Sequence, residues 1–338
     1  MHSLNKDIMM SERRLSSLED IARHIEEKHS FILLPHIGID GDDLGSMIAL
    51  SMGLAKLGKV AHIISHDPVP PLFSFLPSIE KVSSTLPEGT FDSALLMECT
   101  NASRLPRSID LRAHVATVVN IDHHPGNRIE GDLNYIDCSA AAVGEIVYDL
   151  LMLLSVPLDM AMAMGLYVAI LTDTGGFQFA NTTAKTHRIV ADLLRFPLKV
   201  DEISRHIFRE VSLDVLRLEG DVMARLRSSM GGKIVWSTVT LDSLRLYGVE
   251  DEETQFFVEE LNVVKGSLVV VLFKEIDEGA VRVSMRSTTP LVPVNEVASR
   301  YGGGGHVLAA GCTVEGSLES VQDEVLGALA AFMEARGC

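Results

Sequence analysis

The sequence Phe31-Ile-Leu-Leu-Pro-His-Ile-Gly-Ile-Asp-Gly-Asp-Asp43 decides the fold of the first half of the chain. Its first four residues form an uninterrupted apolar run, which predicts a short buried β-strand. The next segment, Leu44–Leu57, has apolar residues at helical spacing and stops at Gly58, a residue type that commonly ends helices. In open α/β sheets, ligands bind at the carboxyl ends of such strands, so we expect a site where this strand meets its helix.

The same alternation of apolar runs and helical patterns continues through the first part of the chain. The expected strands are Phe31–Leu34, Val60–Ser65, Ser93–Met97 and Val115–Ile121. The expected helices are Leu44–Leu57, Ala140–Leu154 and Leu158–Leu171. Continuous apolar strands separated by helices predict an α/β fold with a mostly parallel sheet, flanked by helices on both faces.

The pattern changes after residue 195, and the rest of the chain predicts a second, smaller α/β domain. A charged helical stretch at 199–227 comes first. The expected strands that follow are Lys233–Thr240, Ser267–Glu275 and Ala280–Ser287. The expected helices are Glu253–Val263, Val294–Tyr301 and Ser317–Ala335. We therefore expect a first domain at 1–195, a helical connector at 196–217 and a second domain at 218–338.

The composition limits the partners of the protein. Its 338 residues carry 29 basic and 46 acidic side chains, for a formal net charge of -17, and no run of Lys and Arg. Such a charge repels polyanions and suits a site that concentrates divalent cations. We therefore expect no long nucleic acid as a partner, and a nucleotide substrate, if the protein has one, would be short. The acidity also fits ordinary solubility, and composition alone does not separate these interpretations.

The cysteines and the hydropathy indicate the compartment. The chain has no apolar run of membrane-spanning length, and its first residues lack the apolar core of a secretion signal. The cysteines are widely spaced, which predicts free thiols in a reducing compartment; they are Cys99, Cys138, Cys312 and Cys338. We expect a cytoplasmic protein without a membrane partner; a homodimer is left open.

Acidic and histidine side chains follow several of the predicted elements. They are His36, Asp40 and Asp42 after the first strand, Glu98 after the third, Asp122, His123 and His124 after the fourth, and Asp173 after the helix 158–171. Each group alone also fits a structural role, such as helix capping by Asp42 or Asp43. Six of these residues are candidate ligands of the kinds that Mn²⁺ or Mg²⁺ accepts, enough for two ions with a shared carboxylate; they are His36, Asp40, Asp42, Glu98, His123 and Asp173. Ion pairs about 3.5–4 Å apart recur in phosphoester hydrolysis.

These blocks resemble the DHH superfamily of phosphoesterases, which is named for the triplet seen here as Asp122-His123-His124. The superfamily's His-x-x-x-Asp-x-Asp motif matches residues 36–42, and its Asp in a D-T-G-G-F setting matches Asp173. The second half resembles the associated DHHA1 domain, with S-M-R-S at Ser284–Ser287 and G-G-G-G-H-x-x-A-A-G at Gly302–Gly311. Glu98 departs from the pattern, which usually has Asp at that position.

Within the superfamily the chain resembles most the compact nanoRNase/pAp-phosphatase (oligoribonuclease) branch. That resemblance implies manganese, with Mg²⁺ or Co²⁺ as alternatives, and release of mononucleotides from very short RNA. It also implies conversion of 3′-phosphoadenosine 5′-phosphate to AMP. A hydrolase of cyclic or linear dinucleotides is the alternative with the same metals. A catalytically silent nucleotide-binding protein, with Glu98 as the lesion, is the alternative of another class.

We assign roles as hypotheses. One ion is held by His36, Asp40 and Glu98, and the other by Asp42, Glu98, His123 and Asp173, and a hydroxide that bridges the ions attacks phosphorus in line. Asp122 orients an imidazole, His124 faces the scissile phosphate, and Arg104 clamps a phosphate. The expected substrate-binding residues of the second domain are Arg286, Ser287, Gly302, Gly303, Gly304, Gly305 and His306.

Overall fold

The computed structural model describes residues 15–338 except 101–103, 106–109, 128–130 and 278. The segment considered above as a secretion signal lies outside the described residues. The chain divides into two compact units between Arg209 and Glu210. Helix α7 (Val200–Phe208) belongs to the first unit and helix α8 (Leu213–Ala224) to the second, so the charged stretch that follows residue 198 forms separate helices.

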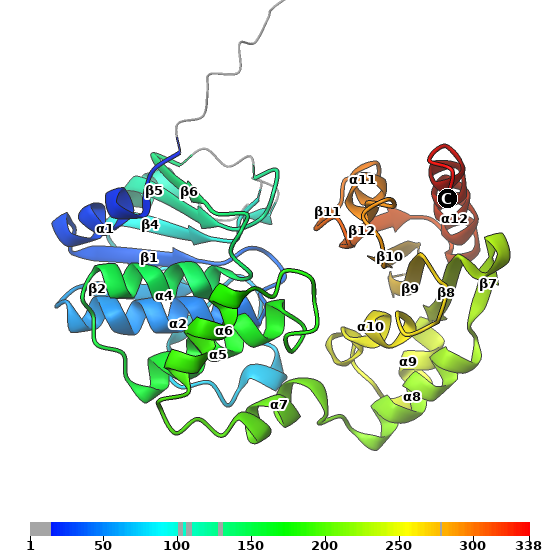
Figure 1. Cartoon of the computed structure of the whole chain (residues 1–338), viewed down its shortest axis with the longest axis horizontal. Coiled ribbons are helices and arrows are strands. Elements are labelled where there is room, and N and C mark those ends of the chain that lie inside the picture. The colour runs from blue at the N-terminus through cyan, green and yellow to red at the C-terminus, as the bar shows by residue number, and fades with distance from the viewer. Residues whose placement is uncertain (1–14, 101–103, 106–109, 128–130, 278) are drawn as a thin grey trace, which may run out of the picture. The chain divides into compact units, whose positions relative to one another are not determined.

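The first unit contains a six-stranded parallel sheet in the order β3-β2-β1-β4-β5-β6 (Figure 1). Its strands are β1 (Ser30–Leu34), β2 (Val60–Ile64), β3 (Val82–Ser83), β4 (Phe91–Met97), β5 (Val115–Asp122) and β6 (Leu133–Ile136). The predicted strands are confirmed as β1, β2, β4 and β5. The edge strands β3 and β6 lack an apolar run, which explains why the sequence pattern does not reveal them. The order reverses between β1 and β4, and ligands bind at such a reversal.

Helices cover the two faces of this sheet unequally. Those of the unit are α1 (Leu18–Glu27), α2 (Gly41–Lys56), α3 (Leu111–His114), α4 (Val143–Leu153), α5 (Met160–Asp173), α6 (Ala184–Leu193) and α7. Phe31 and Leu33 of β1 face the large core formed with α1, α2, α4 and α5. Ile32 and Leu34 face a smaller core on the other side of the sheet. Among the described residues, the helix that packs against this core is α3, through Leu111.

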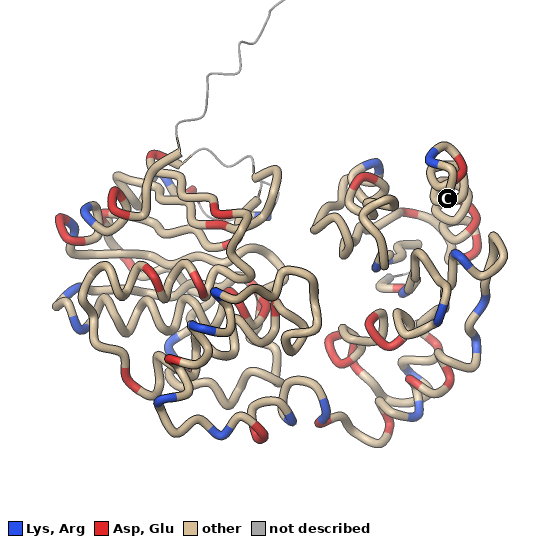
Figure 2. Tube along the Cα trace, viewed as in Figure 1, with Lys and Arg blue, Asp and Glu red and all other residues tan. Residues whose placement is uncertain are grey.

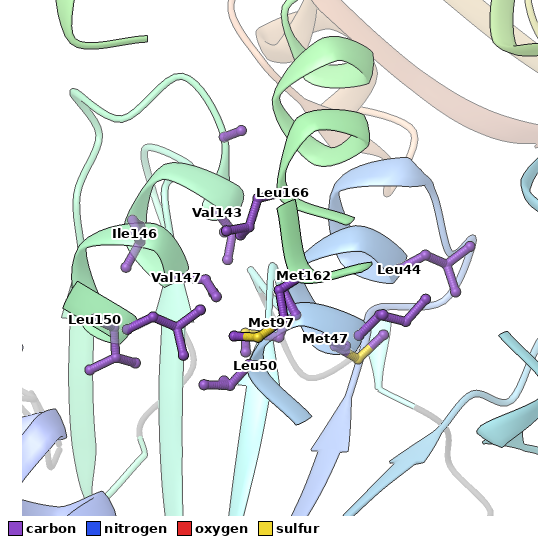
Figure 3. Packing of buried hydrophobic residues seen from close by; sticks show 14 of the residues in the cluster. Leu44, Met47, Leu50, Met97, Val143, Ile146, Val147, Leu150, Met162 and Leu166 are labelled. Carbon is purple, nitrogen blue, oxygen red and sulfur yellow. The ribbon is translucent and has the colours of Figure 1, made fainter. Parts of the chain in front are cut away.

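The large core forms between α2, α4 and α5. Figure 3 shows side chains of these helices interleaved, namely Leu44, Met47, Leu50, Val143, Ile146, Val147, Leu150, Met162 and Leu166. Helices α2 and α5 approach at paired glycines: a Cβ at Gly45 would lie 2.2 Å from the carbonyl oxygen of Gly165. Only glycine permits this distance, and the close packing brings the start of α2 to the end of α5.

The second unit contains a mixed sheet in the order β11-β12-β10-β9-β8-β7, with β8 and β9 parallel and the other pairs antiparallel. Its strands are β7 (Arg227–Ser229), β8 (Ile234–Val239), β9 (Val269–Asp277), β10 (Ala280–Ser287), β11 (Gly304–Gly305) and β12 (Ala309–Glu315). Its helices after α8 are α9 (Leu241–Tyr247), α10 (Phe257–Leu261), α11 (Val294–Ser299) and α12 (Leu318–Glu334). The three predicted strands are confirmed, and the helix expected at 253–263 is shortened to α10 behind a 3₁₀ turn at Asp251–Thr254.

Charged side chains are scattered over both units. Lys and Arg alternate with Asp and Glu along the described trace and form no continuous basic track there (Figure 2). Within the described residues, the apolar helices are all too short to cross a membrane.

Candidate metal centre

Helix α2 begins at Asp40, and this start orients the acidic side chains of the first motif. The Oδ1 atom of Asp40 accepts hydrogen bonds from the N–H groups of Asp42 and Asp43, at 3.0 and 3.1 Å. The structural alternative that Asp42 or Asp43 caps the helix is therefore wrong. Both of these residues lie inside the first helical turn, and both are fully buried.

The ring of His36 is oriented by the backbone that follows β1. Its Nδ1–H donates to the carbonyl oxygen of Ile37 at 2.8 Å. Its Nε2 atom faces carboxylates, at 3.4 Å from Oδ2 of Asp43, 3.8 Å from Oδ2 of Asp40 and 4.0 Å from Oε2 of Glu98. Burial lowers the pKa of His36 to about 4, so the ring is neutral. A neutral ring that donates from Nδ1 has its lone pair on Nε2, the form that binds metal.

Glu98 lies directly after β4 with an unusual backbone. Its φ of 54° is in the left-handed region, which a residue other than glycine seldom adopts. Its N–H donates to the carbonyl oxygen of Ile121 at 3.1 Å, and its side chain is 1% exposed. Burial, together with the nearby carboxylate of Asp42, raises the pKa of Glu98 well above its usual value. Backbone conformations of this kind are concentrated at functional sites.

Asp42 is held by the beginning of helix α4. Its carboxylate accepts hydrogen bonds from the N–H groups of Val143 and Gly144, at 2.6 and 2.8 Å, and from the hydroxyl of Ser46 at 2.9 Å. The positive end of a helix stabilises an anion at this position. The side chain is thereby fixed beside Glu98 and His123, and single ligand atoms of these three residues lie within 4.8 Å of one another.

The two histidines of the triplet after β5 point in different directions. The Nδ1–H of His123 donates to the carbonyl oxygen of Ala140 at 3.1 Å, and its Nε2 lies 3.6 Å from Oδ2 of Asp173. The Nδ1–H of His124 donates instead to Oδ1 of Asp122 at 2.8 Å. The two rings are inclined by 69°. One histidine therefore joins the carboxylate cluster, while the other is anchored outside it by Asp122.

Asp173 ends helix α5 and is partly buried. Burial raises its pKa to about 8. The side-chain amide of Asn181 donates to the backbone carbonyl oxygen of Asp173 at 2.9 Å and approaches its Oδ2 atom at 3.5 Å. The glycines that follow, Gly175 and Gly176, both have positive φ, so the chain turns sharply directly after the carboxylate.

The electrostatics of the cluster favour a bound cation. The pKa of each of the buried carboxyls Asp42, Asp43 and Glu98 is raised, chiefly by burial. Both carboxylate oxygens of Asp43 lack a hydrogen-bond partner among the described residues, and so does Oε1 of Glu98. Burying carboxylates in this way is costly unless a positive charge compensates them. Two overlapping groups could hold metal ions: His36, Asp40, Asp43 and Glu98, and Asp42, Glu98 and His123.

Comparison with known proteins identifies the family. The "DHH family, N-terminal domain" pattern matches residues 30–170, and the "DHHA1 domain" pattern matches residues 220–335. The chain is 36% identical to the bifunctional oligoribonuclease and PAP phosphatase NrnA of Thermus thermophilus over 299 residues. The aligned region covers 87% of this chain and 87% of that protein. The chain belongs to the DHH family. The predicted resemblance and the predicted class of enzyme, a phosphoesterase, are thereby confirmed.

Solved structures agree with this DHH fold. An exopolyphosphatase-related protein from Bacteroides fragilis superposes with a TM-score of 0.86 at 20% identity, over 95% of this chain and 97% of that one. RecJ of Thermus thermophilus in complex with Mn²⁺ superposes with a TM-score of 0.51 at 18% identity, over 97% of this chain and 56% of that one. The α/β architecture predicted from the sequence is thus also that of solved DHH proteins.

The DHH unit brings all six predicted ligands together, and it adds residues that the sequence patterns missed. Asp43 enters the cluster of His36, Asp40 and Glu98. The sequence could have indicated Asp43 by its position. If Asp40 caps the helix, the residue three places later lies on the same side of the first helical turn. Asn127 is another such residue. It donates from its side-chain amide to Asp122 and to the carbonyl oxygen of Cys99, and so fixes the triplet.

Arg104 lies at the margin of the DHH cluster. Its carbonyl oxygen accepts a hydrogen bond from the N–H of Ile37 at 2.8 Å, which ties the segment after β4 to the loop after β1. Burial is the main cause of the lowered pKa of His36, and the charge of Asp40 opposes it. The positive charge of Arg104 lowers the pKa of His36 further. The role of Arg104 as a phosphate clamp stays a prediction.

In the DHHA1 unit, Arg286 is already paired. Its Nε and Nη2 atoms donate to Oε1 of Glu259 at 3.0 and 2.6 Å. Ser287 is buried, and its hydroxyl donates to the carbonyl oxygen of Thr289 at 2.8 Å. These contacts fix the end of β10, and a phosphate would have to compete with Glu259 for the guanidinium of Arg286.

The glycine run of the DHHA1 unit is ordered. Gly304 and Gly305 form β11, which pairs with β12. A Cβ at Gly303 would lie 2.1 Å from the carbonyl oxygen of Gly311, so this position excludes a side chain. Gly302 has a φ of 75° and Gly305 one of 134°, and His306 follows the short strand. The alternative of a flexible linker is therefore wrong.

Proposed function

We propose that this DHH protein is a manganese-dependent phosphoesterase that hydrolyses very short RNA to mononucleotides and 3′-phosphoadenosine 5′-phosphate to AMP. The observation that carries the proposal is the pair of ligand clusters that share the buried carboxylate of Glu98. The two activities for which the Thermus thermophilus relative is named, oligoribonuclease and PAP phosphatase, support the choice of substrate. The Mn²⁺ complex of a structurally similar DHH protein supports the choice of metal.

The donor set fits two divalent ions. His36, Asp40 and Glu98 would hold one ion, and Asp42, Glu98, His123 and Asp173 the other. Oxygen and imidazole ligands of this kind suit Mn²⁺, and Glu98 lies in both clusters as a bridging carboxylate requires. When bound, such a pair of ions activates water and neutralises the charge that develops on the phosphoryl oxygens.

The residues around the clusters orient the substrate and move its protons. Asp122 holds the Nδ1–H of His124 through the 2.8 Å bond and compensates the charge of the ring when Nε2 is protonated as well. The Nε2–H of this imidazolium then faces the scissile phosphate and gives its proton to the leaving oxygen, which leaves His124 neutral. Arg104 clamps a phosphate oxygen, since a guanidinium can donate two parallel hydrogen bonds. In the DHHA1 unit, Arg286 and the glycine run Gly302–Gly305, whose missing side chains let an anion approach the backbone, bind the phosphates beyond the scissile bond.

The test is a substrate panel with the purified full chain and Mn²⁺. The panel contains 5′-labelled RNAs of increasing length from the dinucleotide upward, 3′-phosphoadenosine 5′-phosphate, pyrophosphate and cyclic dinucleotides, each repeated with chelator. The Asp42→Asn variant is the matched inactive control. We expect chelator-sensitive release of mononucleotides that is fastest from the shortest RNAs.

Each other outcome selects a different function. Turnover of cyclic dinucleotides alone would replace the substrate and keep the metal chemistry. Tight nucleotide binding without any turnover would indicate a silent binding protein and reject the proposal.

A further inference from the structure

Asp43 is a buried carboxylate of helix α2 that has no role in the two-ion arrangement proposed above. Its side chain is 0% exposed, and neither of its oxygens accepts a hydrogen bond from the described residues. The usual structural duties of an aspartate at a helix start are performed by Asp40, which caps α2. A buried carboxylate without hydrogen bonds costs free energy, so its presence calls for a compensating charge.

The geometry around Asp43 is that of a ligand. Its Oδ2 atom lies 3.4 Å from Nε2 of His36, closer than the corresponding oxygens of Asp40 at 3.8 Å and Glu98 at 4.0 Å. One atom from each of these four residues lies within 4.8 Å of the others. Metal–ligand bonds of about 2.0–2.2 Å place neighbouring ligand atoms about 3–4 Å apart, which matches these separations.

Hydrogen bonding between Asp43 and His36 does not explain the contact. The ring of His36 uses its Nδ1–H for the carbonyl oxygen of Ile37, so Nε2 is the ring atom that faces Asp43. The 3.4 Å contact between this nitrogen and Oδ2 of Asp43 is not a hydrogen bond, because neither oxygen of Asp43 has a hydrogen-bond partner among the described residues. A ring nitrogen and an unpaired carboxylate oxygen therefore face the same space, an arrangement that a bound cation stabilises.

From these contacts we infer that Asp43 is a direct ligand of the ion that His36, Asp40 and Glu98 hold, so that four protein side chains coordinate this position. The inference rests on the proposed two-ion site. The added carboxylate makes the first position more negatively charged than three ligands would, and it leaves the ligands of the second position unchanged. The first ion should therefore be bound more tightly and retained longer during dialysis.

Metal binding by the full chain tests this ligand without relying on activity. Metal-free wild type and the isosteric variant Asp43→Asn are titrated with Mn²⁺ in a calorimeter, and the metal retained after dialysis is counted. We expect wild type to bind two ions and Asp43→Asn to lose affinity for one of them by at least about tenfold. Glu145→Gln is the matched control: Glu145 is buried on α4, held by Thr186 at 2.6 Å, and should leave both affinities unchanged.

Melting temperatures separate a ligand from a structural residue. Because the variant removes an uncompensated buried carboxyl, metal-free Asp43→Asn should be at least as stable as metal-free wild type, yet gain less on adding Mn²⁺. A lower metal-free melting temperature with an unchanged gain would overturn the inference, and so would wild-type affinity for both ions. If wild type itself binds no Mn²⁺, the proposed function fails and the inference with it. Anomalous diffraction from Mn²⁺-loaded wild-type crystals, which needs no variant, should place an Asp43 oxygen within bonding distance of the ion.

Discussion

Oδ1 of Asp122 accepts a hydrogen bond from Nδ1 of His124 at 2.8 Å, and the same oxygen accepts the N–H groups of His123 and His124 at 2.7 and 3.0 Å. Burial tends to raise the pKa of Asp122, but the hydrogen bond and charge of His124 outweigh it, and the pKa lies below its usual value. An ionised Asp122 thus fixes which nitrogen of His124 carries the proton. The family's defining triplet is in this respect one hydrogen-bonded unit.

Replacing Asp122 by Asn should impair turnover without removing metal. The amide can no longer fix the Nδ1–H tautomer, so we expect kcat to fall by about 10- to 100-fold. Mn²⁺ content after dialysis should stay near that of wild type. The matched control is Asp92→Asn, at the opposite end of β4 from Glu98, where the carboxylate accepts the N–H groups of His29 and Ser30 and the hydroxyl of Ser30. Full loss of both ions from Asp122→Asn would show that the residue acts on the metals instead.

Glu98 should tolerate Asp but not Ala. Aspartate adopts the left-handed backbone more readily than glutamate, so the φ of 54° is no obstacle to Glu98→Asp. We expect this variant to bind two ions and to keep kcat within about tenfold of wild type, because only a methylene is lost. Glu98→Ala should bind fewer ions and lose turnover. Unchanged activity in Glu98→Ala, measured on the dinucleotide, would eliminate the bridging role.

The metal-free protein should lose stability as pH rises. The pKa of Asp173 is about 8 in the folded protein against 3.8 for the ordinary group, so the folded state holds this proton more tightly. The stabilisation is complete below the ordinary value and is lost as pH rises through about 8. The melting temperature in chelator should fall across this window, and Mn²⁺ should reduce the fall. A melting temperature that rises with pH in chelator would contradict the expectation, and Asp173→Asn should flatten the profile.

Arg286 should contribute to substrate binding more than to metal binding. Truncation in Arg286→Ala removes a charged donor, and we expect KM for dinucleotide to rise by roughly tenfold with Mn²⁺ affinity unchanged. The control is Arg282→Ala on the same strand, whose guanidinium donates to Asp251 at 2.8 Å. If Arg286→Ala and Arg282→Ala had the same KM, Arg286 would not contribute to substrate binding. Glu259→Gln should lower KM, because it releases Arg286 from its carboxylate partner.

The contact between Gly45 and Gly165 should be sensitive to a single methyl group. Gly45→Ala would force α2 and α5 apart, and overpacking of this kind costs about 1–3 kcal/mol. For a protein of this size we expect the melting temperature to fall by several degrees. Gly220→Ala on α8 is the control, since no atom lies within 4 Å of the added Cβ there, and it should be neutral or stabilising. A melting temperature of Gly45→Ala equal to wild type would mean that the helices can separate freely.

Local patterns were sufficient to predict the central strands and the positions of the six ligand candidates. Apolar runs such as Phe31–Leu34 must be buried wherever they fold, and a polar side chain directly after such a run lies at the end of a strand. The ligand candidates His36, Glu98 and His123 follow β1, β4 and β5, which are neighbours in the sheet. Their convergence therefore follows from the order of the strands, and the sequence patterns did not predict that order.

Other features depended on contacts between residues far apart in the sequence. The carboxylate of Asp42 accepts a hydrogen bond from the N–H of Val143, which is 101 positions away in the sequence. No local sequence pattern predicts this hydrogen bond. Edge strand β6, a short strand without an apolar run, exists because β5 offers it a partner. The pairing of Arg286 with Glu259 likewise appears only when α10 packs beside β10.

The sequence by itself determined the family, the fold class and the residue types of the candidate metal centre, because these depend on residue order and hydrophobic period. Only the tertiary structure decided which acids share one space. Asp40 became the helix cap, Asp43 became a buried carboxylate beside His36, and Glu98 took a left-handed backbone. Burial, hydrogen bonding and distance between charges are properties of the packed chain, and they alone distinguish a ligand from an acidic residue in a turn.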